Sequence, residues 1–557
     1  VMHRDLNSEV PEADPRPQRC RLARSRYATA LRAGVATAGW AAALRANFGI
    51  WTELNDRIPM NIETFPTNGK RLDVASPLSF CEAGILRSQG VAALLAFILS
   101  NADYSVAQTG DSYEGSLNRN APRGVEIVKF AVPGGRPEEI CVIPQHLPFA
   151  KYRADDAATE KELARYDFYK PGNTPDNGAV AVCPKAKSTS AAVELFEIPS
   201  GSTKPTQESA GYCTQMEKTG KDLAKFKQTD NRYTTTLSGS ILAYYHISRV
   251  LGDICDVKPA VLRTMDIDQH KQVVKLAAEM GIHGLVGKSW GLFNAYYQDP
   301  RTSSVAQALF TSDFNQIYGA LLENTRGKEA YAEWSRAGSN LSSIRAFRNM
   351  VDGRPVKGIL GSSAFSQANV QALVGMRDMS EMIVLDYLMA QSDRLSGGNI
   401  ADYNFVYLID GNHVKEERLP KNASAGAPLG PNQVVVKKLT LVDNDAGLLN
   451  ENTFEKKGYL NQISHMHPET YNRLIAFAQK WKEDPSVKEF LHKECTLSTS
   501  QVARFEKDLM TAAATLQSRH AAGKLLLDLD LDDYFFGKTP QPPPAAATKI
   551  LGRVVLR

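Results

Sequence analysis

The sequence predicts an α+β protein with a small strand-containing first lobe and a larger, mainly helical second lobe. Strand-like runs come early and pair up around turn residues, as at Pro133-Gly134-Gly135, a hairpin signal. The runs are 124–132 with 139–144, and 178–183 with 192–198. Late in the chain, apolar residues recur instead at helical spacing, in 468–482, 486–494 and 499–522. Strands followed by helices, without regular alternation, are typical of an α+β fold.

Composition narrows the class of protein. The 557 residues are 43% hydrophobic and 23% charged, as in ordinary globular proteins. A net charge of +4 is small for this length, so a nucleic-acid partner is not expected. No apolar run reaches the ~18–20 residues that a membrane span needs.

The two ends of the chain differ from the middle. Arginines at 21, 24, 26 and 32 precede an Ala-rich apolar stretch, 33–44. We expect residues 1–46 to be a leader, either a signal peptide with a small-residue site near Ala46 or a short Ala-rich helix. A helix is expected at 85–100. Residues 536–557 are rich in Pro and Ala and predict an unstructured tail.

We expect residues 47–260 to hold an N-terminal extension and the first lobe. A polar, Lys-rich connection runs to about 232 and leads into an apolar helix at 238–251. Residues 261–535 then form the second lobe, with a helical insertion at about 266–375.

The chain has seven cysteines, which are Cys20, Cys81, Cys141, Cys183, Cys213, Cys255 and Cys495. Without the leader six remain, enough for up to three disulfides. Free buried thiols are the alternative. Because no two cysteines form a CxxC pair, a zinc site is not expected.

Two acids follow elements of the second lobe. An apolar helix pattern from residue 382 ends in Ser392-Asp393-Arg394, and an apolar strand, 438–442, runs into Asp443. Phosphoryl transfer needs one carboxylate to position the acceptor hydroxyl and another to hold the metal that bridges the nucleotide phosphates. We expect Arg394 to be a structural partner for this acidic region.

These stretches resemble a known family. Asp386-Tyr-Leu-Met-Ala-Gln-Ser-Asp-Arg394, followed by Val442-Asp-Asn-Asp-Ala-Gly447, is similar to motifs of the atypical secretory-pathway kinases, the Golgi casein-kinase family. Spore-coat kinases and type II phosphatidylinositol 4-kinases are more distant relatives. Residues 240–251 resemble a helix of the same family. The resemblance runs from roughly residue 190 to the low 500s.

The resemblance implies a two-lobed protein-kinase-like fold that uses ATP with Mg²⁺ or Mn²⁺. It makes Asp393 the catalytic acid and Asp443 the metal ligand. Ordinary kinases place a second metal ligand, an Asn, five residues after the catalytic acid, but Gly398 stands there. We prefer Asn404 as the ligand of metal and nucleotide, because it stands directly before a strand. Asn399 remains an alternative for the nucleotide-binding amide.

The first lobe departs from the family pattern. A kinase holds the nucleotide phosphates with a strand lysine, which a helix glutamate keeps in place. The glutamate would fall near Ser240 or Ile241, and the lysine near Phe196, where the match gives Glu197.

Three lysines, Lys185, Lys187 and Lys204, lie in the neighbouring sequence. Lys204 is the candidate for nucleotide contact. Asp445 stands where the family has glycine. It is either a second carboxylate of the metal site or, as we expect, a solvated turn acid.

The sequence therefore predicts a metal-dependent kinase that transfers the ATP γ-phosphate to a hydroxyl of a protein (Ser/Thr) or a glycan. Two alternatives are a nucleotide-binding pseudokinase that activates or scaffolds a partner, such as a related kinase, and a kinase-fold adenylyltransferase. The leader and the cysteines favour a secreted, secretory-pathway or periplasmic location over a cytoplasmic one.

Overall fold

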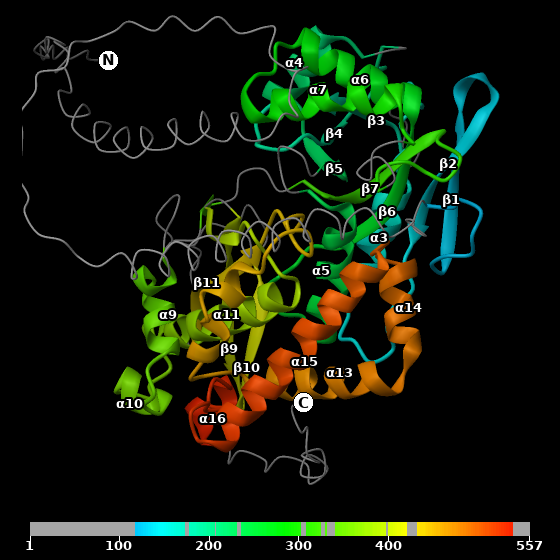
Figure 1. Cartoon of the computed structure of the whole chain (residues 1–557). Coiled ribbons are helices and arrows are strands. Elements are labelled where there is room, and N and C mark those ends of the chain that lie inside the picture. Colours follow the sequence, from blue (N-terminus) through cyan, green and yellow to red (C-terminus); the bar gives the residue numbers. More distant parts are fainter. Residues whose placement is uncertain are drawn as a thin grey trace, which may run out of the picture. The chain divides into compact units, whose positions relative to one another are not determined.

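The first lobe is built on an antiparallel seven-stranded sheet with the order β1-β2-β6-β7-β5-β4-β3, seen in the upper half of Figure 1. Its strands are β1 (Glu126–Val132), β2 (Arg136–Ile143), β3 (Val180–Pro184), β4 (Val193–Glu197), β5 (Asp222–Gln228), β6 (Ala260–Asp266) and β7 (Gln316–Glu323). The helices of this part are α3 (Asp156–Ala164), α4 (Ala210–Thr219), α5 (Ser238–Val250), α6 (Ile267–Glu279) and α7 (Gly284–Gln298).

The computed structural model describes residues 117–537 except 173–177, 206–207, 231–235, 302–307, 325–328, 331–339, 397–398, 420–429 and 431. The expected leader, the helix at 85–100, nearly all of the tail, and two of the cysteines (Cys20 and Cys81) lie outside the described residues.

Both faces of the large sheet are packed, because successive side chains of its strands point to opposite faces. Ala224 and Phe226 of β5 point into an apolar cluster that includes Val273 of α6 and Phe293 of α7. On the opposite face, residues of β6 and β7 such as Tyr318 belong to the main core together with helix α5. The strand β5 therefore presents its odd-numbered side chains toward the second lobe.

The second lobe packs helices around a smaller sheet. Strand β9 (Ile400–Asp410) pairs antiparallel with β8 (Glu329–Ala330), β10 (His413–Arg418) and β11 (Gln433–Leu441). The helices are α9 (Arg345–Met350), α10 (Val356–Leu360), α11 (Gln367–Leu388), α12 (Thr453–Lys456), α13 (Pro468–Glu483), α14 (Pro485–Lys493), α15 (Thr499–Ala521) and α16 (Leu531–Phe536). None of the helices in the described residues is long and apolar enough to cross a membrane.

The predicted α+β class is confirmed, with a strand-rich first lobe and a mainly helical second lobe. Both expected strand pairs, β1 with β2 and β3 with β4, are present. The large sheet continues past the expected lobe boundary at residue 260, however. Strands β6 and β7 lie in its middle, so the expected insertion at about 266–375 contributes a central strand.

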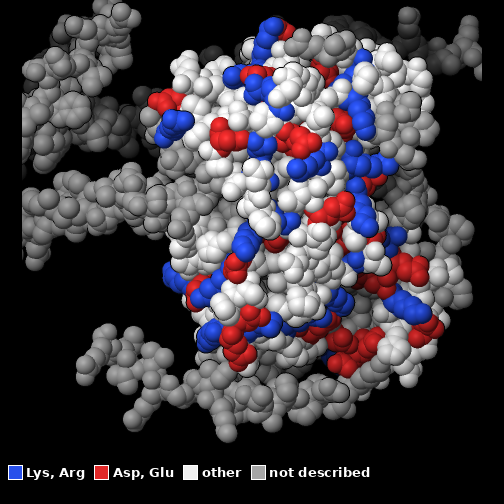
Figure 2. Space-filling view, turned by 90° about the vertical axis from the view of Figure 1, so that its right-hand side faces the viewer, with Lys and Arg blue, Asp and Glu red and all other residues white. Residues whose placement is uncertain are grey.

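Charged side chains are mixed over the surface. On the face that Figure 2 shows, Lys and Arg lie interspersed with Asp and Glu. The small net charge of +4 is thus not concentrated there in one basic stripe, the pattern that nucleic-acid binding would need.

One disulfide joins Cys183 in β3 to Cys213 in α4. Cys141, Cys255 and Cys495 are buried free thiols. The sequence allowed up to three disulfides, and the described residues contain one. The other three cysteines of this part are buried thiols, the alternative that the sequence left open.

The disulfide closes a loop of 30 residues, so its removal should cost about 2–4 kcal/mol of stability. We expect the Cys183→Ser/Cys213→Ser variant to unfold at lower denaturant concentration than the wild type. Dithiothreitol should lower the midpoint of the wild type and leave the variant unchanged. A wild-type midpoint insensitive to the reductant would contradict this prediction.

Candidate functional site

Strand β5 carries two lysines to the side of the sheet that faces the second lobe. Lys225 and Lys227 alternate with the core residues Ala224 and Phe226. Lys225 pairs across the strands with Leu322 of β7. The lysine side chains are only 5% and 3% exposed, so their ammonium groups must be paired.

Asp443 supplies the opposite charge from the second lobe. Strand β11 ends at Leu441, and the chain turns at Asp443, whose φ of 49° is left-handed. Asp is one of the few residues that adopts this conformation at moderate cost. The turn directs the carboxylate toward β5, with Oδ1 3.2 Å from Nζ of Lys225 and 3.6 Å from Nζ of Lys227.

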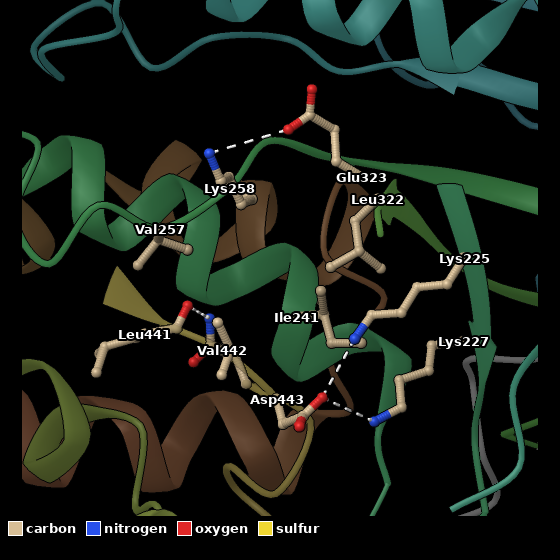
Figure 3. Close-up of a pocket in the computed structure, with 11 residues that line it drawn as sticks. Lys225, Lys227, Ile241, Val257, Lys258, Leu322, Glu323, Leu441, Val442 and Asp443 are labelled. Carbon is tan, nitrogen blue, oxygen red and sulfur yellow. Dashed lines mark hydrogen bonds and ion pairs between the residues drawn. The ribbon is translucent and has the colours of Figure 1, made fainter. Parts of the chain in front are cut away.

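A pocket opens beside these ion pairs (Figure 3). It is a small pocket, part of it open to solvent. Ile241 of α5, Val257 and Leu322 give it apolar walls. Lys258 and Glu323 line the pocket as well, across the apolar walls from Asp443 (Figure 3). Charged groups beside apolar walls suit a ligand with an anionic part and a flat or apolar part.

Among the described residues, three lysines and two acids line the pocket, and a fourth lysine, Lys185, lies near Lys225. Burial, together with repulsion from Lys225, lowers the pKa of Lys185 to about 8. Burial also lowers the pKa of Lys258 to about 8, although Asp256 opposes this. Crowded lysines with lowered pKa values favour binding of an anion, because its charge would stabilise their protonated forms.

Asp445 is buried, contrary to the expectation of a solvated turn acid. The whole residue is 5% exposed. Its Oδ2 accepts hydrogen bonds from Lys227 and, at 3.2 Å, from the hydroxyl of Thr236. Burial would lower the pKa of Lys227, but the nearby Asp445 and Asp443 raise it above the ordinary lysine value.

Arg394 joins the loop that carries Asp393 to the turn that carries Asp443. Its guanidinium is fully buried and forms a bidentate pair with Asp386 at 2.9 and 3.1 Å. The remaining N–H groups donate to the carbonyl oxygens of Asn399 and Val442 and to Oδ1 of Asn444. Arg394 is therefore the structural partner that the sequence predicted.

The structure brings Asn399, one of the two alternative amides, to the catalytic candidate. Its Nδ2 donates to the carbonyl oxygen of Asp393 at 2.9 Å and to Oδ2 of the same residue at 3.2 Å. Its own carbonyl accepts from the N–H of Val442, the neighbour of Asp443. Asp393 is exposed and does not line the pocket.

Asn404 lies elsewhere, although the sequence preferred it. It pairs with Lys437 in the middle of the β9–β11 ladder, four residues from the Leu441–Ile400 pair at the strand end. At ~3.3 Å per residue, this is about 13 Å from the end of the ladder, and Asp443 lies two residues beyond that end. The loop before β9 is shorter than the preference for Asn404 assumed.

The structure does not bring Lys204 to the pocket either. Its Nζ donates to the carbonyl oxygens of Phe168 and Val180 and pairs with Glu208 at 3.2 Å. These contacts use the three donors of an ammonium group. Lys204 thus ties the β3 edge together, and the lysines that meet Asp443 are those of β5.

Sequence reasoning missed β5 because it treated 199–232 as a polar, Lys-rich connection. The signal was present in Asp222-Leu-Ala-Lys-Phe-Lys-Gln228, where Ala224 and Phe226 alternate with lysines. Such period-two alternation predicts a half-buried strand.

Helix α5 follows β5 but has no carboxylate along Ser238–Val250. At the position expected for the glutamate, the Ser240 hydroxyl donates to the carbonyl oxygen of Asn444 at 2.7 Å. Gly447 is needed beside it, because a Cβ there would come within 2.5 Å of the Ser240 hydroxyl. The helix is thus packed directly on the Asp443 turn.

The acids at the pocket suit a divalent cation that is held partly by the protein and partly by a bound ligand. They do not form a site that would enclose the cation with protein ligands alone. Among the residues that the structure describes, no group of three or more His, Cys, Asp or Glu side chains could hold a metal. Mg²⁺, however, is commonly held by one or two carboxylates together with substrate phosphates. Asp443, whose side chain is 35% exposed at the pocket, fits that role.

The chain is similar in structure to the Golgi casein kinase. Its crystal structure with Mn/ADP bound matches with a TM-score of 0.35 and 12% identity, over 68% of this chain and 81% of that one. A second crystal structure of the Golgi casein kinase matches with a TM-score of 0.34 and 11% identity, over 68% of this chain and 80% of that one. No family model and no curated protein sequence matches the chain.

Replacing Arg394 should destabilise the protein strongly, because the buried Asp386 would lose its cation and keep only the hydrogen bond from the Tyr244 hydroxyl. We expect Arg394→Met to cost about 3–5 kcal/mol, measured by chemical denaturation. Arg354, which is 66% exposed, offers a control, and Arg354→Met should change stability by no more than about 0.5 kcal/mol. Equal effects of the two substitutions would contradict the role given to Arg394.

Proposed function

We propose that the chain is a kinase that binds ATP with Mg²⁺ or Mn²⁺ in the pocket of Figure 3 and transfers the γ-phosphate to a hydroxyl. The observation that carries this proposal is the meeting of Lys225 and Lys227 with Asp443 at the pocket. Lysines on a strand and an acid at the end of another strand are the parts that hold nucleotide phosphates and metal in kinases.

Each residue then has a distinct task. Lys225 and Lys227 bind phosphate oxygens, and Asp443, with Asn399 as the second candidate ligand, holds the metal. The metal ion, when bound, neutralises charge that develops on the phosphates. Asp393, exposed and hydrogen-bonded to Asn399, orients the acceptor hydroxyl.

The acceptor is proposed to be a protein Ser/Thr or a glycan hydroxyl. The disulfide Cys183–Cys213 supports a secretory or periplasmic location, because disulfides persist in oxidising compartments.

One observation favours a second candidate, a nucleotide-binding pseudokinase that acts through a partner such as a related kinase. Helix α5 has no carboxylate to hold the strand lysine. An active protein kinase uses such a pair.

Transfer of label from γ-³²P-ATP and α-³²P-ATP in the presence of Mn²⁺ separates these functions. We expect γ-label to move to the acceptor, and Asp443→Asn to reduce the rate at least about a hundredfold, as when a group that stabilises the transition state is removed. The exposed acid Asp410 provides a control, since Asp410→Asn should leave the rate unchanged.

Movement of the α-label instead would indicate an adenylyltransferase. ATP binding without transfer of either label would favour the pseudokinase. A protein that neither transfers label nor binds ATP would refute both functions.

Lys225 can be tested by binding alone. Because a hydrogen bond to a charged group contributes about 1.5–3 kcal/mol, Lys225→Met should weaken ATP binding by tenfold or more in calorimetry. Lys221 precedes β5 and is 74% exposed, and Lys221→Met should bind ATP like the wild type. If Lys204→Met weakened binding and Lys225→Met did not, the assignment of the phosphate lysines would be wrong.

A further inference from the structure

The second acid of the turn after β11 holds one of the two pocket lysines. The Asp445 side chain is 7% exposed, against 35% for Asp443. Its carboxylate accepts from Lys227 and from Thr236. Asp443, by contrast, is shared between Lys225 and Lys227 at longer distances.

Protein kinases keep the phosphate-binding lysine in place with a glutamate from the helix that follows its strand. Here that helix is α5, and it carries only uncharged residues and one arginine along Ser238–Val250. The acid that pairs with the strand lysine Lys227 is Asp445, which comes from the turn after β11.

The same turn also fixes the start of α5. The N–H of Leu237 donates to the carbonyl oxygen of Asp445 at 2.8 Å. Thr236 donates its hydroxyl to the Asp445 carboxylate, and Ser240 donates to the carbonyl of Asn444. Strand β5, the start of α5 and the turn are therefore joined at Asp445.

We infer that Asp445 is a positioning residue for the nucleotide phosphates: it takes the place of the missing helix glutamate by holding Lys227. The inference rests on the proposed function, which assigns Asp443 to the metal. When Asp443 holds the metal, its carboxylate is no longer available to both lysines. Asp445 stays paired with Lys227. An ammonium group has three N–H donors, so Lys227 can contact Asp445 and phosphate oxygens together.

Binding of ATP and of adenosine tests this role, because only ATP carries phosphates. We expect Asp445→Asn to raise the Kd for ATP about tenfold, equivalent to about 1.4 kcal/mol, and to leave the Kd for adenosine within about twofold. Asp402, a buried acid of β9 paired with Lys437 at 3.6 Å, is the matched control. Asp402→Asn should change neither Kd.

A double-mutant cycle shows whether Asp445 acts through Lys227. In a Lys227→Met background, Asp445→Asn should weaken ATP binding no further, and the Mn²⁺ concentration for half-maximal ATP binding should stay the same. A further loss of ATP affinity with a raised Mn²⁺ requirement would overturn the inference and make Asp445 a metal ligand. Equal loss of ATP and adenosine binding in Asp445→Asn would overturn it in favour of a purely structural role.

The thermal stability of the same four proteins reports on the pair without any nucleotide. Asp445→Asn should lower Tm in the wild type by more than it does in Lys227→Met, because only in the wild type does the buried ammonium lose its nearer acid and keep only the longer contact with Asp443. Equal losses in the two backgrounds would show that the pair is not formed, which overturns the inference.

ATP binding distinguishes a failure of the proposed function from a failure of the role given to Asp445. Wild-type protein that binds no ATP would overturn the proposed function and with it the phosphate role of Asp445. Normal ATP binding by both the wild type and Asp445→Asn would overturn this inference alone.

Discussion

The buried guanidinium of Arg394 is the contact on which the candidate site depends. It pairs with Asp386 at the end of α11 and donates to Asn399 before β9 and to Val442 after β11. Three segments far apart in the sequence are thereby held at one point. Asp393 is the neighbour of Arg394 and Asp443 is the neighbour of Val442, so both acids are placed by the same side chain.

The second constraint is charge burial between the lobes. Lys225 and Lys227 are almost completely buried on a sheet face that also packs apolar residues. An unpaired ammonium there would cost several kcal/mol. Asp443 and Asp445 supply the opposite charges, and the pairing holds the turn of the second lobe against β5 of the first.

Much of the fold was readable from the sequence because it depends on local patterns. The hairpin at Pro133-Gly134-Gly135, the β3–β4 pair and the long helices α13 to α15 are all recovered within a few residues of their expected bounds. The order of Asp393 and Asp443 after a helix and a strand was also readable, because each acid ends a regular element.

The rest depends on contacts that no local pattern contains. Lys204 was chosen by its nearness in sequence to the expected strand, and only the tertiary structure shows its ammonium used by Phe168, Val180 and Glu208. Asn404 stood directly before an apolar run, but the strand begins earlier, at Ile400. The burial of Asp445 follows from its pairing with Lys227, 218 residues away in the chain.

The attachment of α5 to the Asp443 turn has a consequence for regulation. Many protein kinases are switched off when the corresponding helix moves outward and separates lysine from acid. In this chain such a movement would break the bonds that Leu237, Thr236 and Ser240 make to the turn, each worth on the order of 1 kcal/mol. Under the proposed function, these bonds would hold α5 in its working position without a regulatory partner, and the rate would then follow the supply of nucleotide and acceptor.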